Sequence, residues 1–104
     1  MFSQLKSLFS GGPSLDYVDL KQRNVFILDV RTPGEFRGGH VADSVNIPLN
    51  LLGNQLNKLP KDRPIVACCA SGNRSGSTTR MLQSQGFEVY NGGSWGAVDR
   101  GMND

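Results

Sequence analysis

The sequence predicts an α/β domain in which a central, mainly parallel sheet is covered by helices on both faces. Short apolar runs rich in β-branched residues alternate along the chain with segments whose apolar residues recur at helical spacing. Because these runs are apolar on both faces, they are typical of parallel strands buried between helices. The chain has 104 residues, which suits one such domain.

Composition and charge restrict the classes of function. The chain is 38% hydrophobic and 19% charged, which is typical of a soluble globular domain and argues against disorder. The net charge is only +2 and the basic residues are scattered, so nucleic acid is not an expected partner, whereas a small anionic ligand is. No stretch has the apolar length of a transmembrane helix, and no membrane partner is expected.

The chain is expected to consist of a short tail and one domain. A Gly-Gly-Pro stretch separates the tail, residues 1–13, from the domain, residues 14–104. Ser14 is suited to cap a helix over residues 14–20. The apolar run VFILDV follows at 25–30 and predicts a buried strand.

A capping box predicts the start of the next helix. Thr32 as N-cap, Pro33 at the first helical position and Glu35 three residues after the cap indicate a helical turn that ends at 38–39. The remaining elements continue the alternation. They are expected as a strand at 44–49, a helix that Asn50 caps and that runs to 59, a strand at 64–69, a helix at 75–85, a strand at 87–93 and a turn or short helix over 94–104.

The stretch ACCASGNRSG at 67–76 joins a predicted strand to a predicted helix. In parallel sheets ligands bind beyond the carboxyl ends of the strands, so this loop is the candidate site. The backbone N–H groups of such a loop, with a helix N-terminus behind them, form a cradle for an anion. A thiol in the cradle has a lowered pKa and is a stronger nucleophile at neutral pH. The candidate cradle residues are Ala70, Ser71, Gly72, Asn73, Arg74 and Ser75.

Two adjacent cysteines are candidates for the nucleophile. Alternate side chains of a strand point to opposite faces, so Cys68 is expected in the core and Cys69 is the first residue able to face the cradle. A disulfide between neighbours would be strained and would close almost no loop, so free thiols and a cytoplasmic location are expected. Counted from Cys68, however, Cys-x5-Arg up to Arg74 has the spacing of cysteine-dependent phosphatases, which leaves that alternative open.

Other residues are candidates for the wall of the site. Asp29 and Arg31 could contact substrate, but a structural role is favoured, with Asp29 accepting hydrogen bonds from nearby backbone and Arg31 paired with a carboxylate such as Glu35. Trp95 is a candidate for the pocket wall or for the core. His40 is interpreted as a packed turn residue. No second histidine or spaced cysteine pair accompanies it, so no metal site is expected.

Three blocks of the sequence resemble the rhodanese-like domain family. They are ILDVRTPGEFRGGHVADSVNIPL at 27–49, IVACCASGNRSG at 65–76, in which Cys69 stands at the catalytic position, and VYNGGSW at 89–95. The resemblance covers most of residues 14–100 and implies a three-layer domain with a central sheet of about five strands. The first strand usual in the family is best matched by Leu15-Asp16-Tyr17, which conflicts with the helix expected there.

The resemblance also implies sulfurtransferase chemistry. The Cys69 thiolate would take a sulfane sulfur from thiosulfate or a related anionic donor, carry it as a persulfide and pass it to cyanide or to a thiol acceptor, small molecule or protein. No metal or organic cofactor is implied, and we expect a monomer. Two other functions stay open: a phosphatase or arsenate reductase that uses Cys68 and Arg74, and a non-catalytic module that carries sulfur or binds a partner.

Overall fold

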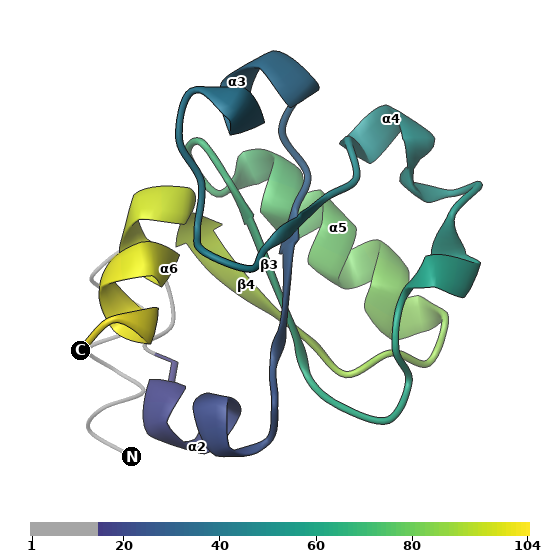
Figure 1. Ribbon diagram of the computed structural model, residues 1–104. Helices are drawn as coiled ribbons and strands as arrows, with labels where there is room; N and C mark the ends of the chain where they lie inside the picture. Colours follow the sequence, from purple (N-terminus) through teal and green to yellow (C-terminus); the bar gives the residue numbers. More distant parts are fainter. Residues whose placement is uncertain (1–14) are drawn as a thin grey trace.

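The computed structural model describes residues 15–104, and the tail predicted at 1–13 and the cap predicted at Ser14 lie outside them. The fold is the predicted α/β arrangement, with a parallel sheet between layers of helices (Figure 1). The strands stand in the order β2-β1-β3-β4. They are β1 Phe26–Asp29, β2 Val45–Asn46, β3 Ile65–Cys69 and β4 Val89–Ser94.

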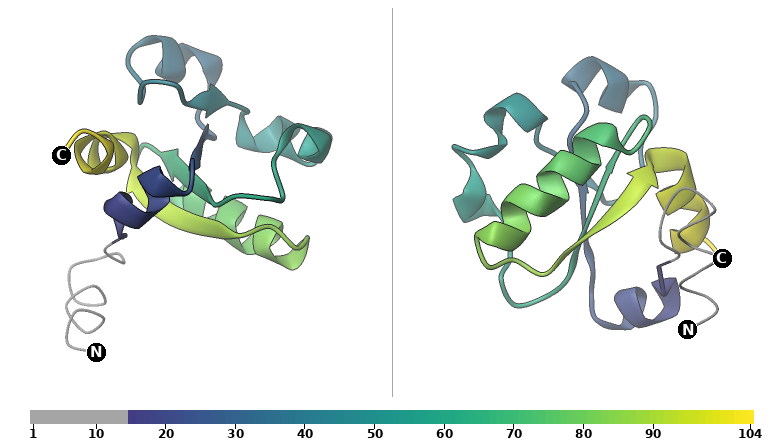
Figure 2. Two further views of the ribbon diagram at one scale, coloured as in Figure 1. Left: turned by 60° about the horizontal axis from the view of Figure 1, so that its bottom comes forward. Right: turned by 180° about the vertical axis from the view of Figure 1, so that it is seen from behind.

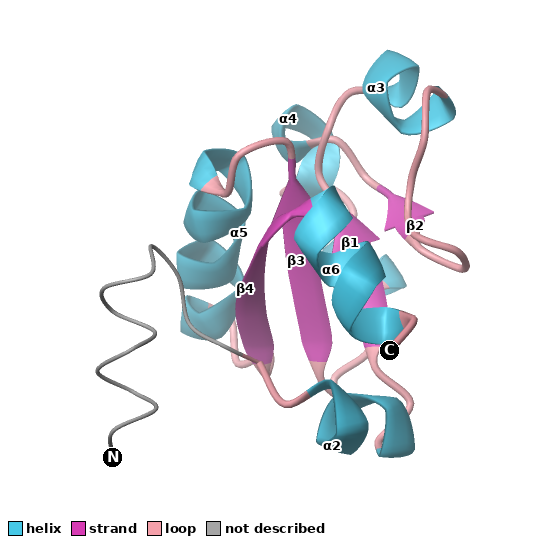
Figure 3. Ribbon diagram, turned by 90° about the vertical axis from the view of Figure 1, so that its left-hand side faces the viewer, coloured by secondary structure: helices cyan, strands magenta, loops and turns pink. Residues whose placement is uncertain are grey.

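Helices cover both faces of this sheet. They are α2 Tyr17–Gln22, α3 Pro33–Arg37, α4 Leu49–Leu52, α5 Asn73–Ser84 and α6 Trp95–Met102, and a 3₁₀ turn, η1, spans Leu56–Lys58. α5 packs on β3 and β4 from one side, and α6 packs on the same strands from the other side (Figure 2). α2 lies at one end of the sheet, whereas α3 and α4 lie at the end where the strands finish (Figure 3).

Two apolar clusters separate the layers. All five residues of β3 are buried, and their side chains alternate between the two clusters. Because both faces of the strand are buried, its sequence is one continuous apolar run. The cluster on the α5 side consists of Leu28, Val30, Ile47, Leu52, Leu59, Ile65, Ala67, Cys69, Leu82, Phe87 and Val89. The cluster beneath α2 and α6 consists of Leu20, Ile27, Val41, Val66, Cys68 and Val98.

The first predicted helix is displaced along the chain. Instead of spanning 14–20, α2 begins at Tyr17, because the Asp16 side chain caps it by accepting a hydrogen bond from the Asp19 N–H at 3.1 Å. Of the segment that was the alternative for a first strand, Tyr17 begins this helix, and Leu15 and Asp16 lie in no strand. The described residues therefore form four strands, where the family resemblance implied about five.

The helix predicted from Asn50 to 59 is two separate turns. α4 ends at Leu52 with Gly53 as its C-cap, and η1 follows after a break. Leu52 and Leu59 nevertheless both lie in the cluster on the α5 side. The leucine spacing therefore identifies side chains that face the core, but it does not require one continuous helix between them.

The capping box of α3 is confirmed. The Glu35 N–H donates to Thr32 Oγ1 at 3.2 Å, and the Thr32 N–H donates to Glu35 Oε1 at 2.9 Å. α5 begins at Asn73 instead of residue 75, directly after Gly72. The first turn of α5 thus starts close to the end of β3. The short helix predicted at the end of the chain is α6, which Ser94 caps.

Candidate functional site

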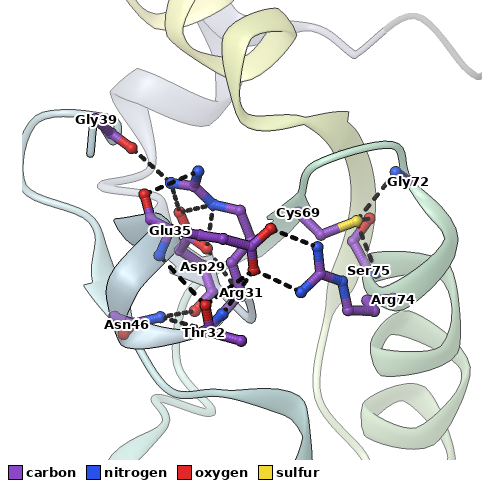
Figure 4. A network of polar contacts seen from close by, with 10 residues as sticks. All are labelled: Asp29, Arg31, Thr32, Glu35, Gly39, Asn46, Cys69, Gly72, Arg74 and Ser75. Carbon is purple, nitrogen blue, oxygen red and sulfur yellow. Dashed lines mark hydrogen bonds and ion pairs between the residues drawn. The ribbon is translucent and has the colours of Figure 1, made fainter. Parts of the chain in front are cut away.

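The turn from β3 into α5 wraps around the sulfur of Cys69 (Figure 4). The Gly72 N–H donates a hydrogen bond to Sγ at 3.0 Å, and the Ser75 N–H donates another at 3.4 Å. Gly72 has a φ of 103°, a left-handed conformation that favours glycine and that turns the chain back toward the end of the strand. Backbone donors at the start of a helix therefore converge on one sulfur, an arrangement that stabilises negative charge.

The two cysteines differ in their tendency to ionise. Burial alone would raise the pKa of Cys69, but the Ser75 hydroxyl, when it donates to the thiolate, and the N–H groups of Ser75, Gly72 and Ser71 hold this pKa below the usual value of a thiol. Burial is the main cause that raises the pKa of Cys68 to about 12. At neutral pH Cys69 is therefore the cysteine more able to form a thiolate.

Cys68 faces away from the loop. Its side chain is fully buried in the cluster beneath α2 and α6, and both cysteines are free thiols. The phosphatase spacing from Cys68 to Arg74 would require the Cys68 side chain to point into the loop. Alternation along β3 places that side chain on the opposite face, so the loop surrounds the sulfur of Cys69 instead.

Three of the predicted cradle residues act on this sulfur. Gly72 and Ser75 contact it, and the Ser71 N–H helps to lower its pKa. Ala70 and Asn73 are exposed, and Asn73 is the first residue of α5. The cradle is therefore made mainly by the backbone, as expected for a loop of small residues.

A further contact leads from the sulfur to β4. Ser75 Oγ lies 3.4 Å from Cys69 Sγ and donates a hydrogen bond to Asn91 Oδ1 at 2.7 Å. Asn91 Oδ1 also accepts from the Gly93 N–H at 2.9 Å, and Asn91 Nδ2 donates to the Gly72 carbonyl oxygen at 3.3 Å. One amide thus holds the loop, the first turn of α5 and the end of β4 together.

A bulge in β4 sets the position of Asn91. Ala67 pairs with Asn91 and Cys68 pairs with Gly93, so Gly92 is an extra residue in the strand. A Cβ atom at Gly92 would overlap side chains of β3 and α6, so only glycine fits there. Sequence patterns did not single out Asn91. The available signal is a polar residue in a strand directly before two glycines, a composition typical of a bulge.

Arg74, predicted as a positive charge at the edge of the loop, is paired with Glu35 of α3. Its guanidinium donates to the two carboxylate oxygens at 2.8 and 3.0 Å. Hydrogen bonding by Arg74 is the largest cause that lowers the pKa of Glu35 to about 2, and the capping box adds to it. A hollow of about 280 Å³ lies beside the pair, lined by Val30, Thr32, Pro48, Leu49, Asn50 and Arg74.

Asp29 and Arg31 form a buried ion pair. Arg31 Nη2 lies 2.7 Å from Asp29 Oδ2, and Asp29 also accepts the Arg31 backbone N–H at 3.0 Å, as predicted. Arg31 thus pairs with a carboxylate, as predicted, but its partner is Asp29 instead of the suggested Glu35, which Arg74 occupies. Arg31 instead donates to the backbone carbonyl oxygens of Glu35 and Gly39 at 3.3 and 2.7 Å. The pair therefore anchors the segment that carries α3.

Trp95 and His40 have packing contacts. Trp95 packs against the cluster beneath α2 and α6, with the Arg31 guanidinium 5.0 Å from the centre of its ring. His40 stacks on Phe36 with ring centroids 3.7 Å apart, as suits a packed turn residue. In the part of the chain that the structure describes, no cluster of His, Cys, Asp or Glu side chains is placed to hold a metal ion. No helix within residues 15–104 is long and apolar enough to cross a membrane.

Comparison with known proteins finds relatives that are named sulfurtransferases. A sulfurtransferase from Allochromatium vinosum is 35% identical over 78 residues, which are 70% of this chain and 73% of that protein. Thiosulfate sulfurtransferase GlpE from Pseudomonas syringae is 33% identical over 72 residues, which are 68% of each chain. The protein YqhL of Bacillus subtilis is 39% identical over 70 residues, and this match spans 66% of our chain and 56% of that protein.

The fold and the family agree. A solved structure of a rhodanese-related protein from Thermoplasma volcanium has a TM-score of 0.70 to this structure at 32% identity, over 85% of this chain and 92% of that one. Residues 15–96 match the model of the rhodanese-like domain. The chain therefore belongs to the rhodanese-like domain family.

Proposed function

We propose that this protein is a sulfurtransferase in which Cys69 receives a sulfur atom and passes it on as a persulfide. The observation that carries the proposal is the convergence of the Gly72 and Ser75 N–H groups on Cys69 Sγ, at 3.0 and 3.4 Å. These donors stabilise a thiolate, and sulfur transfer requires a nucleophilic thiolate. The relatives named sulfurtransferases support transfer of sulfur in general, and the name of one of them suggests thiosulfate as the donor.

The proposed reaction is a double displacement. The Cys69 thiolate attacks the outer sulfur of thiosulfate, so that a new S–S bond forms while the S–S bond of thiosulfate breaks. Sulfite leaves with the bonding electron pair. Cyanide or a thiolate then attacks the terminal sulfur of the persulfide, and Cys69 leaves again as a thiolate. The protein returns to its starting state with no net oxidation.

Arg74 is the residue that we assign to the anionic end of the donor. Because Arg74 is paired with Glu35, the anionic group of the donor competes with this carboxylate for the charge of the guanidinium. The Cys69 side chain is fully buried. We therefore propose that the acceptor attacks the terminal sulfur of the persulfide, because this atom projects beyond Sγ. The acceptor is cyanide, a small thiol or a thiol-bearing protein, and the acting unit is a monomer in the cytoplasm.

The proposal is tested by measuring the intact mass of the protein after incubation with thiosulfate. Wild type and Cys68→Ser should gain the mass of one sulfur atom, cyanide should remove it, and Cys69→Ser should gain nothing. Cys68→Ser is the matched control, because it changes the neighbouring thiol on the opposite face of β3. If no form gains sulfur, transfer from thiosulfate is wrong. Stable loading followed by poor turnover with cyanide or thiols would indicate a sulfur carrier instead.

The phosphatase alternative is not favoured. It needs Cys68 as nucleophile, whereas burial raises the pKa of this thiol to about 12 and its side chain lies beneath α2 and α6. Hydrolysis of an aryl phosphate that Cys68→Ser abolishes and Cys69→Ser retains would reverse this preference.

A further inference from the structure

The hydrogen bonds of Asn91 have a direction that the backbone fixes. Asn91 Oδ1 accepts from the Gly93 N–H at 2.9 Å, and Asn91 Nδ2 donates to the Gly72 carbonyl oxygen at 3.3 Å. A backbone N–H only donates and a carbonyl oxygen only accepts, so reversing the amide would break both bonds. Asn91 Oδ1 is therefore the atom that faces Ser75.

This direction determines where the proton of the Ser75 hydroxyl lies. An amide oxygen has no proton to give, so Ser75 is the donor in the 2.7 Å contact with Asn91 Oδ1. The hydroxyl has a single proton. In the 3.4 Å contact with Cys69 Sγ, Ser75 Oγ is then the acceptor, and the proton between them belongs to a Cys69 thiol. The resting arrangement is a relay in which Cys69 donates to Ser75 and Ser75 donates to Asn91.

Ionisation of Cys69 reverses the first link of this relay. A thiolate has no proton, so Ser75 stabilises it only by turning its own proton from Asn91 to the sulfur. The Gly72 and Ser75 N–H groups meet no such competition, because their direction is set by the backbone. We propose that Asn91 is a positioning residue that holds the Ser75 hydroxyl proton away from the sulfur and so favours the thiol form of Cys69 in the resting protein.

Packing supports the relay. Ser75 is fully buried, so bulk water does not replace either of its partners. The bulge at Gly92 fixes the backbone from which Asn91 reaches the first turn of α5. The charged and titratable groups around the loop are Arg74 on α5, Glu35 on α3, Asp29 on β1 with Arg31 beyond it, and Cys68 on β3. Arg80 of α5 adds a cation near the Asn91 amide, since both side chains lie over Gly76. β4 contributes only neutral residues from Asn91 to its end.

The test is the pH dependence of Cys69 alkylation by iodoacetamide, followed by intact mass and by mapping of the labelled cysteine. Asn91→Ala frees the Ser75 proton for the sulfur, so the pH at which the alkylation rate of Cys69 is half-maximal, its midpoint, should fall by about one unit. Below the midpoint this shift corresponds to an about tenfold larger fraction of thiolate. Asn91→Asp keeps the acceptor and adds negative charge, so its midpoint should rise. A rise in Asn91→Ala, a fall in Asn91→Asp, or no shift in either overturns the proposal.

A double-mutant comparison separates the relay from a general disturbance of the loop. In a Ser75→Ala background the relay is already interrupted, so Asn91→Ala should no longer lower the midpoint. If Asn91 acts only by supporting the Gly72 peptide, the shift persists in that background and the relay is wrong. Circular dichroism establishes that each variant is folded. If Asn91→Ala does not fold, Asn91→Asp is compared with and without Ser75→Ala: a larger rise when Ser75 is present supports the relay, and an equal rise, due to charge alone, overturns it.

The inference depends on the proposed function only for its consequence in catalysis, since alkylation needs no sulfur donor. A protein that takes no sulfur from thiosulfate but shows these shifts would overturn the proposed function and support the relay. A protein that loads sulfur on Cys69 but shows no shift in the Asn91 variants would do the reverse.

Discussion

Arg74 and Glu35 join the first turn of α5 to the first turn of α3 through a two-point ion pair, with N–O distances of 2.8 and 3.0 Å. α5 follows the strand that carries Cys69, and α3 follows β1, so the pair links two segments at the end of the sheet where the strands finish. The Glu35 carboxylate also accepts the Thr32 N–H of the capping box. An anion that binds at Arg74 therefore meets a guanidinium whose charge is already balanced by a carboxylate that is held in place.

Replacing Glu35 by glutamine is expected to strengthen the binding of thiosulfate. Glutamine keeps the capping box but removes the negative charge that competes for Arg74. The KM for thiosulfate should fall by about two- to fivefold, since exposed ion pairs are weak. Arg74→Met, the matched variant on the other side of the pair, should raise it. Steady-state kinetics with cyanide as acceptor measure both, and a higher KM in Glu35→Gln would contradict the competition.

The same ion pair makes stability in acid depend on Glu35. Its carboxyl has a pKa of about 2 in the folded protein against an ordinary value of 4.5, so the unfolded chain takes up the proton at higher pH. The stabilisation is complete above the ordinary value and is lost as the pH falls from 4.5 toward 2. In Glu35→Gln, the free energy of unfolding should fall less steeply across this range. Denaturant titrations at stepped pH would show equal slopes if the pair does not contribute.

Cys68 should remain unmodified under conditions in which Cys69 reacts. Its pKa of about 12 lies above the ordinary value of 9.0, so a thiolate forms there only in strong alkali. Iodoacetamide at neutral pH should add one group, mapped to Cys69, and Cys68→Ala should leave this reaction unchanged. The variant should lower the free energy of unfolding by about 1–2 kcal/mol, because it removes a buried sulfur. Equal labelling of both cysteines would place Cys68 within reach of solvent.

Breaking the buried pair of Asp29 and Arg31 should destabilise the fold more than any change to the exposed pair. Arg31→Met leaves the Asp29 carboxylate buried without its partner, at a cost of about 3–5 kcal/mol. The double variant Asp29→Leu with Arg31→Met should recover part of this loss, because no unpaired charge remains. Urea denaturation measures both variants. A loss below about 1 kcal/mol in Arg31→Met would mean that water or another cation compensates the carboxylate.

Sequence predictions succeed where the contacting residues are close together in the sequence. The capping box of Thr32 and Glu35 could be predicted because both partners belong to one turn of helix, where spacing alone sets the geometry. The different orientations of Cys68 and Cys69 could be predicted because strand side chains alternate. The single helix predicted from Asn50 to 59 failed because leucines at helical spacing reach the core equally well from two short turns.

The sequence by itself determined the alternation of strands and helices, the loop at the end of β3 and the cysteine that this loop surrounds, since backbone periodicity and short-range hydrogen bonds dictate them. Only the tertiary structure decided that Arg74 pairs with Glu35, 39 positions away, and that Ser75 donates to Asn91, 16 positions away. Both pairings depend on which strands are neighbours, and the pairing of Ser75 with Asn91 also depends on the bulge that positions Asn91. A pattern of residues along the chain does not contain those distances.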